Sequence, residues 1–403
     1  MKKILLFTLL ASILFLTSCQ DPIFEAIRED VPPEEATVSG NITSITRYTA
    51  GTKEFLLLAA NDGLRYKQKD LNRHGEWKSY KLPFSTHSYD FYSSGHSGEQ
   101  LLTVLADSTT LYLISAEYTQ TDTEGISYPS KIKIWGKVIT SNGTELNSDG
   151  DWTSIPEPEN VPPLFPIEED STTSFYKSKF KVFQTNSPIQ DHRKVFIRSY
   201  DSKNDEYHYY QLNGLSTPAE ITIDPASIID PSPSEDAGYV PLASSAVWFN
   251  GEIKFFTSTV ATTNETYADE ADYYYYSNGN STLYYSNGSD KGSIDTDHNI
   301  SALATCSDII LIGYGNMVTG NAGGIDKVIL DNKIPTSLGT FTTNAQFQIT
   351  SDFIVLALLN ATPEKSELES SLYSAINFPG TSESFSNVGL WSYYPSRGNW
   401  NRE

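Results

Sequence analysis

The hydrophobic and polar positions from Ser39 onward alternate in short runs, separated by turns rich in Gly, Asn, Asp and Ser. The runs hold β-branched and aromatic residues, and signals for helices are nearly absent. Runs of this composition, bounded by turn residues, are typical of β-strands. Six pairs of runs stand out, each joined by a short polar turn: 42–48 with 54–60, 87–92 with 100–106, 175–183 with 194–200, 245–249 with 252–259, 299–305 with 308–314, and 345–350 with 352–359. The pattern therefore predicts an all-β protein built from paired strands.

The second run of a pair is usually the more apolar one, as in residues 55–60 and 353–359. Strands that are apolar on both faces lie between other layers rather than at a surface. We therefore expect several sheets that stack face to face, with these strands in the middle of the stack.

Three of the six tryptophans follow a turn glycine by two residues, at Trp77, Trp152 and Trp400. The first and last copies share more, because Gly-Leu at 63–64 and at 389–390 precedes them in the same order. Glycine readily takes the positive φ of a hairpin turn, and tryptophan offers a large apolar ring. We interpret the motif as a repeated hairpin whose tryptophan packs the outer strand against the neighbouring sheet. Three unrelated turns are the alternative.

Repeats of about 45 to 65 residues, each with about four strands, are typical of a β-propeller. The runs that start at 42 and 87 are 45 residues apart, and those at 299 and 345 are 46 apart. Six blades fit the six pairs. Seven blades are the alternative, because residues 108–170 are long enough to hold a further blade around 131–140; we interpret them as an extended hairpin of the second blade. The proline-rich segments 156–166 and 224–241 are expected to be long loops between blades.

The N-terminus has the pattern of an export signal. Lys2 and Lys3 precede an apolar run of thirteen residues, 4–16, which is short for a membrane span and suits a signal peptide. Leu16-Thr17-Ser18-Cys19 follows. This segment resembles the lipobox of bacterial lipoproteins, in which the cysteine is acylated and becomes the first residue of the mature chain. An ordinary secretory signal with an unrelated cysteine is the alternative.

The resemblance divides the chain into three expected parts: a signal peptide at 1–18, a lipidated N-terminus and tether at 19–38, and a propeller domain at 39–403. The tether carries six acids and two consecutive prolines, a composition that holds a domain away from the membrane surface. The resemblance to the lipobox also implies attachment to a lipid bilayer through Cys19. Gln20 is not the aspartate that commonly retains such lipoproteins at the inner membrane, so we expect an extracytoplasmic position at the outer membrane or cell surface.

The second cysteine, Cys306, cannot form an intramolecular disulfide once Cys19 is acylated. It stands just before an apolar run, so we expect a buried structural thiol. The chain holds 28 basic and 50 acidic residues, a formal net charge of -22. This balance argues against binding to nucleic acid, which depends on Lys and Arg, and against electrostatic attachment to anionic lipid.

Motifs for catalysis or metal binding are weak. The six histidines show no i, i+4 spacing, and no Gly-x-Ser-x-Gly occurs. Asp295-x-Asp297-x-Asn299 has the alternating oxygen ligands that open a calcium loop but lacks the glycine and glutamate that complete one. An acidic turn leading into a strand is the preferred interpretation. The turn at 147–152 faintly resembles the Asp-box of sialidase-type propellers but departs from its spacing.

Tyrosines are concentrated between 267 and 285, with four in succession at 273–276. A recognition loop would use tyrosine for contact area and its hydroxyl. The preferred interpretation is an outer hairpin whose alternate tyrosines pack between blades.

Together, the lipobox and the blade-like repeats resemble propeller lipoproteins of diderm bacteria. The sequence predicts a membrane-anchored binding or interaction module for a protein or glycan ligand, with no catalytic residues, no metal and no cofactor. A carbohydrate-active enzyme on a propeller scaffold and an outer-membrane assembly scaffold are the alternatives.

Overall fold

The computed structural model describes Val38 and residues 42–403 with gaps, of which those longer than eight residues are 85–97, 159–179, 224–242, 362–370 and 378–387. Residues 1–37 lie outside the described part of the chain, and so do the predicted signal peptide and Cys19. The described residues contain 26 strands and one short 3-10 helix, η1 (Gln190–His192). Among them, no helix has the length and apolar character needed to cross a membrane.

The strands form six sheets, five of four strands and one of six. The first two sheets contain β1 (Ile42–Ala50), β2 (Lys53–Ala60), β3 (Gly63–Lys69) and β4 (Lys78–Tyr80), then β5 (Gly98–Ala106), β6 (Thr110–Thr121), β7 (Ser127–Val138) and β8 (Thr153–Ser154). The third contains β9 (Lys181–Thr185), β10 (Val195–Asp201), β11 (Glu206–Gln211) and β12 (Ala219–Ile221), with β13 (Ala243–Phe249) and β14 (Glu252–Phe256) added to it.

The other three sheets each consist of four consecutive strands. The fourth contains β15 (Ser258–Thr263), β16 (Ala271–Ser277), β17 (Thr282–Ser286) and β18 (Lys291–Asp295). The fifth contains β19 (Ile300–Cys306), β20 (Ile309–Tyr314), β21 (Ile325–Asp331) and β22 (Ile334–Thr340). The sixth contains β23 (Ile354–Asn360), β24 (Leu372–Asn377), β25 (Gly389–Tyr394) and β26 (Asn399–Arg402).

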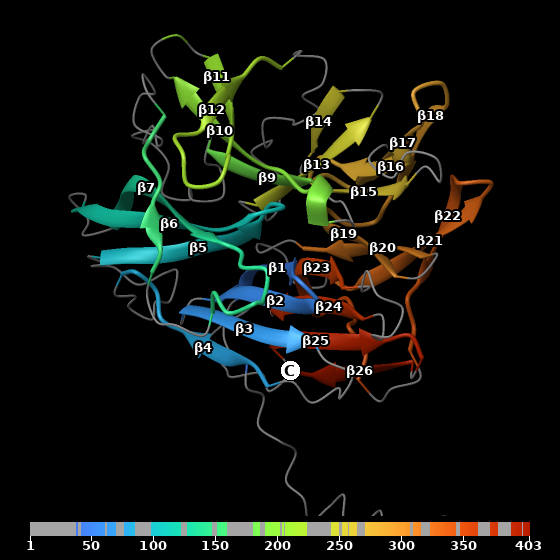
Figure 1. Cartoon of the computed structure of the whole chain (residues 1–403). Helices are drawn as coiled ribbons and strands as arrows, with labels where there is room; N and C mark the ends of the chain where they lie inside the picture. Colours follow the sequence, from blue (N-terminus) through green and yellow to red (C-terminus); the bar gives the residue numbers. More distant parts are fainter. Residues whose placement is uncertain are drawn as a thin grey trace, which may run out of the picture. The chain divides into compact units, whose positions relative to one another are not determined.

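The six sheets of the described region stand as blades around a common axis (Figure 1). Each blade begins at its innermost strand and runs outward through antiparallel neighbours. The innermost strands contact one another around the ring, as β23 does with β1 and β1 with β5. The predicted six-bladed β-propeller is confirmed. Residues 110–121 and 127–138 form β6 and β7 of the second blade, so for the described residues the preferred interpretation as an extended hairpin is also confirmed.

The hairpin of β13 and β14 departs from the regular ring. β13 pairs in parallel with β9, the innermost strand of the third blade, and β14 pairs antiparallel with β13. β13 also contacts β15 of the fourth blade, so the hairpin stands between two blades. The predicted run 245–249 lies in β13, whereas the predicted run 252–259 contains β14 and the first two residues of β15. This predicted pair therefore does not form a blade of its own. The fourth blade instead lies at 258–295, where no complete pair of runs was predicted, because polar residues interrupt its strands.

Two further pairs were assigned incorrectly. Residues 100–106 and 353–359 were predicted as second strands, whereas β5 and β23 are the innermost strands of their blades. The predicted partner of 100–106, at 87–92, lies outside the described residues. In the other pair the predicted first strand was 345–350, and its described residues 347–350 are not in a strand. The error has a physical cause. An innermost strand is enclosed by its neighbours around the axis, and it can be as apolar as the second strand that lies between two sheets.

The core lies in layers between neighbouring blades. Every second residue of β1 is buried, whereas β2 is buried along nearly its whole length because its two faces contact different blades. Leu57 packs in a cluster with residues of the second blade, and Leu56 and Leu58 pack in a cluster with residues of the sixth. The period-two alternation of side chains thus connects each blade with both of its neighbours.

The three tryptophans of the repeated motif each contact the preceding blade. Trp77 meets Tyr373 of the sixth blade edge to face at 6.4 Å, and Trp152 meets Tyr80 of the first blade at 6.3 Å. Trp400 meets Phe341, which follows the last strand of the fifth blade. The hairpin interpretation is supported where its glycine is described, because Gly398 has a φ of 67°. Gly75 and Gly150 lie outside the described residues.

The same repeat relates the third strands of the first and sixth blades. Gly63 and Gly389 begin β3 and β25, and both have a φ of 130°. The leucine that follows each glycine is at most 1% exposed. Both blades therefore use glycine to enter the third strand with a backbone conformation that other residues rarely adopt.

Glu403 joins the sixth blade to the first. Its carboxylate accepts hydrogen bonds from Lys67 Nζ at 2.5 Å and from Trp77 Nε1 at 2.8 Å, and the Lys67 and Glu403 side chains are both less than a tenth exposed. Its backbone oxygen accepts a hydrogen bond from Val38 N. Lys69 Nζ also donates to Ala361 O and Ser371 Oγ across the same junction. Each blade consists of consecutive strands, so among the described residues the ring is closed here by these side-chain bonds together with the backbone bond from Val38 N.

Candidate functional site

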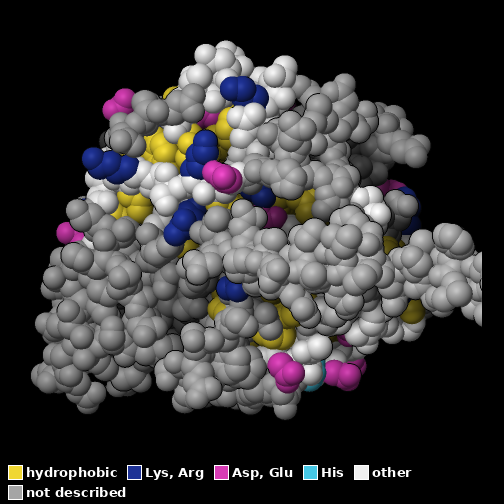
Figure 2. Space-filling model, turned by 90° about the horizontal axis from the view of Figure 1, so that it is seen from below, with side chains coloured by type: hydrophobic (Ala, Val, Ile, Leu, Met, Phe, Trp, Pro, Cys, Tyr) yellow, Lys and Arg dark blue, Asp and Glu magenta, His cyan; other side chains and the backbone are white. Residues whose placement is uncertain are grey.

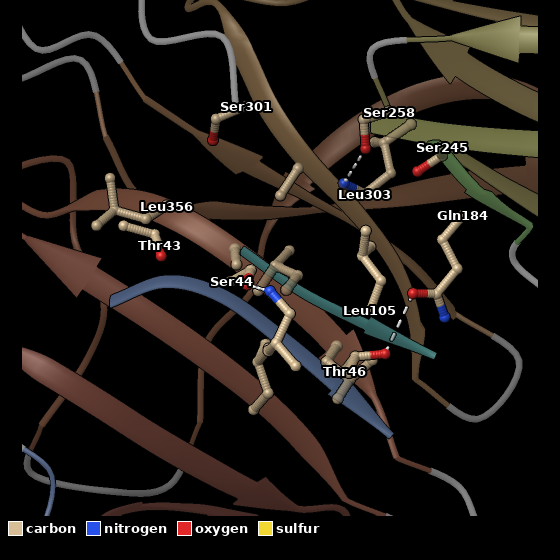
Figure 3. Close-up of a pocket in the computed structure, with 16 residues that line it drawn as sticks. Thr43, Ser44, Thr46, Leu105, Gln184, Ser245, Ser258, Ser301, Leu303 and Leu356 are labelled. Carbon is tan, nitrogen blue, oxygen red and sulfur yellow. Dashed lines mark hydrogen bonds between the residues drawn. The ribbon is translucent and has the colours of Figure 1, made fainter. Parts of the chain in front are cut away.

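A cavity of about 130 Å³ lies where the innermost strands of the ring meet. Sixteen residues line it, contributed by every blade and by the β13–β14 hairpin: Thr43, Ser44, Ile45, Thr46, Val104, Leu105, Gln184, Ser245, Ser258, Ser301, Ala302, Leu303, Leu356, Ala357, Leu358 and Leu359. Figure 3 shows Gln184, Ser245 and Ser258 on one side of the cavity and Leu356 on the opposite side. Thr43 lies beside Leu356, and Leu303 lies beside Ser258, so polar and apolar side chains are mixed around the lining.

Three serines of the lining hold neighbouring blades together. Ser44 Oγ accepts a hydrogen bond from Val104 N at 2.9 Å, and Ser258 Oγ accepts one from Leu303 N at 2.8 Å. Ser301 Oγ lies 2.6 Å from Val355 O of the sixth blade and 3.0 Å from Gly313 O of its own blade. Both carbonyl oxygens are acceptors for its one hydroxyl proton. These serines lie near the start of β1, β15 and β19, where each reaches the innermost strand of the next blade.

Gln184 and Ser245 occupy the irregular junction between β9 and β13. The two residues are partners in the parallel register, so they stand side by side on one face of the pair. Thr46 Oγ1 donates to Gln184 Oε1 at 3.2 Å across the axis. Within the described part of the chain, the Gln184 amide nitrogen and the Ser245 hydroxyl have no hydrogen-bond partner. The unused hydrogen-bonding groups of the lining are therefore concentrated at this junction.

The lining of the cavity carries no charged side chain. None of its sixteen lining residues is acidic, basic or a histidine. General acid–base catalysis and metal binding both require such groups, and a glycosidase uses a pair of carboxyl groups. The arrangement can donate and accept hydrogen bonds and can shelter hydrocarbon, which is chemistry suited to binding an uncharged molecule.

The predicted site residues are placed as follows. Cys19 lies outside the described residues. Asp295 ends β18 and accepts a hydrogen bond from Thr282 Oγ1, while Asp297 and Asn299 form the connection to β19. The segment is thus the link between the fourth and fifth blades, which agrees with the acidic-turn interpretation. The described residues contain no group of three or more His, Cys, Asp or Glu side chains placed to hold a metal.

The described tyrosines of the 267–285 segment lie on β16 and β17. Tyr273 and Tyr275 pack toward the fifth blade, and Tyr274 and Tyr276 pack with tilted rings against Phe256 of the hairpin. Tyr275 Oη donates to Lys333 O at 2.7 Å. Burial is the main cause that raises the pKa of Tyr276 to about 12, and it raises the pKa of Tyr275 further. The structure agrees with packing between blades; Tyr267 lies outside the described residues.

Cys306 ends β19 and is buried, as predicted. Burial raises the pKa of its thiol to about 11, so the thiol is protonated at neutral pH. It belongs to the apolar cluster between the fifth and sixth blades. The residue is a structural thiol.

Another group of polar side chains lies on the second blade. Glu99 is 8% exposed and accepts hydrogen bonds from Ser115 Oγ at 2.5 Å, Trp135 Nε1 at 2.9 Å and Lys133 Nζ at 3.1 Å. Lys133 also pairs with Glu117. The groups satisfy one another, so this cluster is a structural network and leaves little capacity for a ligand.

Sequence reasoning missed the residues of the cavity. Gln184 and Ser245 are ordinary polar residues of their strands, and their register across β9 and β13 follows from a parallel pairing that no local pattern specifies. The available signal was the recurrence of serine near the start of a blade's first strand, at Ser44, Ser258 and Ser301.

On the face shown in Figure 2, acidic and basic side chains among the described residues are interspersed with apolar ones.

No protein-family model matches the chain, and no curated protein matches it. Solved structures that resemble it include a fungal six-bladed β-propeller lectin with a fucose recognition mode, from Aleuria aurantia, at 10% identity and a TM-score of 0.37 over 92% of this chain and 96% of that one.

An α-L-arabinanase from Cellvibrio cellulosa is similar at 9% identity and a TM-score of 0.32, over 88% of this chain and 91% of that one. The GH43 protein BlXynB from Bacillus licheniformis is similar at 10% identity and a TM-score of 0.35, over 89% of this chain and 52% of that one. Likenesses this distant carry no argument about what the present chain binds. The propeller fold of this chain follows from the order of its strands in the six sheets. What the chain can bind is inferred from the residues that line its cavity.

Proposed function

We propose that this protein is an extracytoplasmic lipoprotein, anchored through acylated Cys19 at the outer membrane or cell surface, whose propeller works as a binding module. The apolar run at 4–16 and the segment Leu16-Thr17-Ser18-Cys19 support export and acylation. Two or more acyl chains anchor a protein stably, at about 0.8 kcal/mol per buried methylene. Because the net charge of -22 disfavours anionic headgroups, attachment depends on this residue alone.

The neutral cavity is the observation that favours binding over catalysis. Its lining offers hydroxyl groups, one amide and aliphatic side chains, and it offers no carboxyl pair, histidine or thiol. The serines that join the blades also fix the positions of their own hydroxyls, because each contacts the backbone of the next blade. A rigid set of uncharged groups suits reversible recognition.

The test is a Cys19→Ala variant of the full chain, expressed in a diderm bacterial host and compared with the unaltered chain. Fractionation and labelling with a fatty acid are expected to place the unaltered protein in the membrane fraction with label, and the variant outside it without label. Cys306→Ala is the matched control, because it removes the other cysteine and should leave both labelling and fractionation unchanged. A Cys19→Ala protein that is still acylated and still bound to membranes would overturn the anchor.

A further inference from the structure

The irregular junction of the ring leaves hydrogen-bonding groups facing the cavity. At three of the regular junctions, Ser44, Ser258 and Ser301 each bond to the backbone of the next blade. At the β9–β13 junction, two backbones pair directly in parallel, so no such side chain is needed there. The Gln184 amide nitrogen and the Ser245 hydroxyl line the cavity with no partner among the described residues.

We propose that the axial cavity binds a single neutral monosaccharide or a polyol of similar size, held by Gln184 and Ser245. The inference rests on the proposed binding-module function and names its ligand class. Ser44 and Ser258 add further polar groups to the lining, because a hydroxyl that accepts a backbone hydrogen bond can still donate its own proton. The lining thus contains amide and hydroxyl groups that can form hydrogen bonds with one small molecule.

The size of the cavity suits a small ligand. At about 130 Å³ it is smaller than pockets for drug-sized ligands, which occupy about 300–1,000 Å³. A cavity of roughly this size, about 150 Å³, holds one six-membered ring such as benzene. One sugar ring or an open polyol of up to about six carbons matches that volume.

The charge of the lining limits the ligand further. A carboxylate or an ammonium group would enter without a counter-charge, since all sixteen lining residues are uncharged, and the cost of desolvating the ion would not be recovered. The excess of acidic residues in the chain also repels anions. Leu303 and Leu356 contribute hydrocarbon to the lining, which suits the C–H face of a sugar.

The experiment uses the acylated full chain, purified in a detergent whose headgroup is not a sugar. D-xylose, D-galactose and xylitol are titrated by calorimetry, alongside the charged analogues D-glucuronate and D-glucosamine. At least one neutral probe is expected to bind with a Kd at or below about 1 mM, and the charged analogue of similar size at least tenfold more weakly. Absence of binding by every neutral probe, or equal binding by the charged ones, would overturn the proposal.

Three variants locate the binding. Gln184→Leu and Ser245→Ala each remove one hydrogen-bonding group and are expected to weaken binding about five- to tenfold. Ser245→Leu fills the cavity and is expected to abolish binding. Gln211→Leu is the matched control, because Gln211 lies on β11 of the same sheet outside the cavity, and its affinity should be unchanged.

Thermal unfolding of each variant establishes that it is folded. If Ser245→Leu does not fold, Gln184→Leu and Ser245→Ala still show whether the ligand binds in the cavity. Binding that survives these substitutions lies elsewhere, which overturns the cavity assignment and leaves the binding module standing. Cleavage of a glycoside by the chain would overturn the binding module itself. Anchoring through Cys19 is measured separately by fractionation and labelling, and its failure would leave the binding assignment of the cavity unaffected.

Discussion

The junctions of the first blade with its two neighbours differ in construction from the junction between the third and fourth blades. Around the first blade, single side chains reach across: Trp77 and Glu403 on one side, Trp152 on the other. Between the third and fourth blades, the whole β13–β14 hairpin is inserted. The first arrangement repeats along the chain, whereas the second occurs once among the described blades.

The inserted hairpin works as a two-sided apolar wedge. Ala246 and Phe255 face the cluster of the third blade, while Val247 and Phe256 face Tyr274 of the fourth. Successive residues of a strand point to opposite faces, so one hairpin can serve both neighbours. Three regular junctions thus use a serine near the axis to hold the ring, whereas at the wedge Gln184 and Ser245 line the cavity instead.

The largest expected effect concerns the tryptophan packing. Trp152→Ala is expected to lower the free energy of unfolding by about 3–5 kcal/mol, because it leaves a large void against Tyr80 in a buried cluster. Trp152 is 7% exposed, and its indole nitrogen has no hydrogen-bond partner among the described groups, so its contribution comes from packing. Urea unfolding at constant slope measures the change.

Tyr207→Ala is the matched control, because Tyr207 is also an aromatic residue of a blade but is 39% exposed. Its loss is expected to cost about 1 kcal/mol or less. Equal costs for the two substitutions would contradict the idea that tryptophan packing holds the regular junctions.

The second effect concerns the closure by Glu403. Glu403→Ala is expected to cost about 2–3 kcal/mol, because it leaves the Lys67 ammonium and the Trp77 indole without their shared acceptor in a mostly buried position. Glu403→Gln keeps an acceptor for Trp77 and should cost less. Hydrogen exchange should become faster in the first and sixth blades and stay unchanged in the fourth. Uniform acceleration around the ring would show that closure is not local to this junction.

The sequence predicted the regular part of the ring and not the wedge. The strand pair 42–48 with 54–60 and the motif at Trp77 repeat locally, so period and turn residues are enough to find them. The parallel pairing of Ser245 with Gln184 joins residues 61 apart in the chain, and its only local trace is an ordinary hairpin. Six blades were counted correctly, although the six predicted pairs do not match them one to one.

The cavity was beyond sequence reasoning for a related reason. Its lining consists of single residues from strands throughout the chain, such as Thr46, Gln184 and Ser258, and each is an unremarkable polar residue in its own strand. The packing of the tyrosines was predictable, because alternation in four successive positions places Tyr273 and Tyr275 on one face and Tyr274 and Tyr276 on the other.

The smallest expected effect tests the tyrosine packing of the fourth blade. Tyr275→Phe removes the hydroxyl that donates to Lys333 O and is expected to cost about 1 kcal/mol at pH 7. Burial raises the pKa of Tyr275 above its ordinary value of 10, so the folded protein disfavours the phenolate. The stabilising contribution of the hydroxyl is therefore fully present below pH 10 and is lost as the pH rises from 10 toward the folded-state pKa. Urea midpoints of the two proteins should converge above pH 10, and a constant difference from pH 7 to pH 11 would contradict the burial of this hydroxyl.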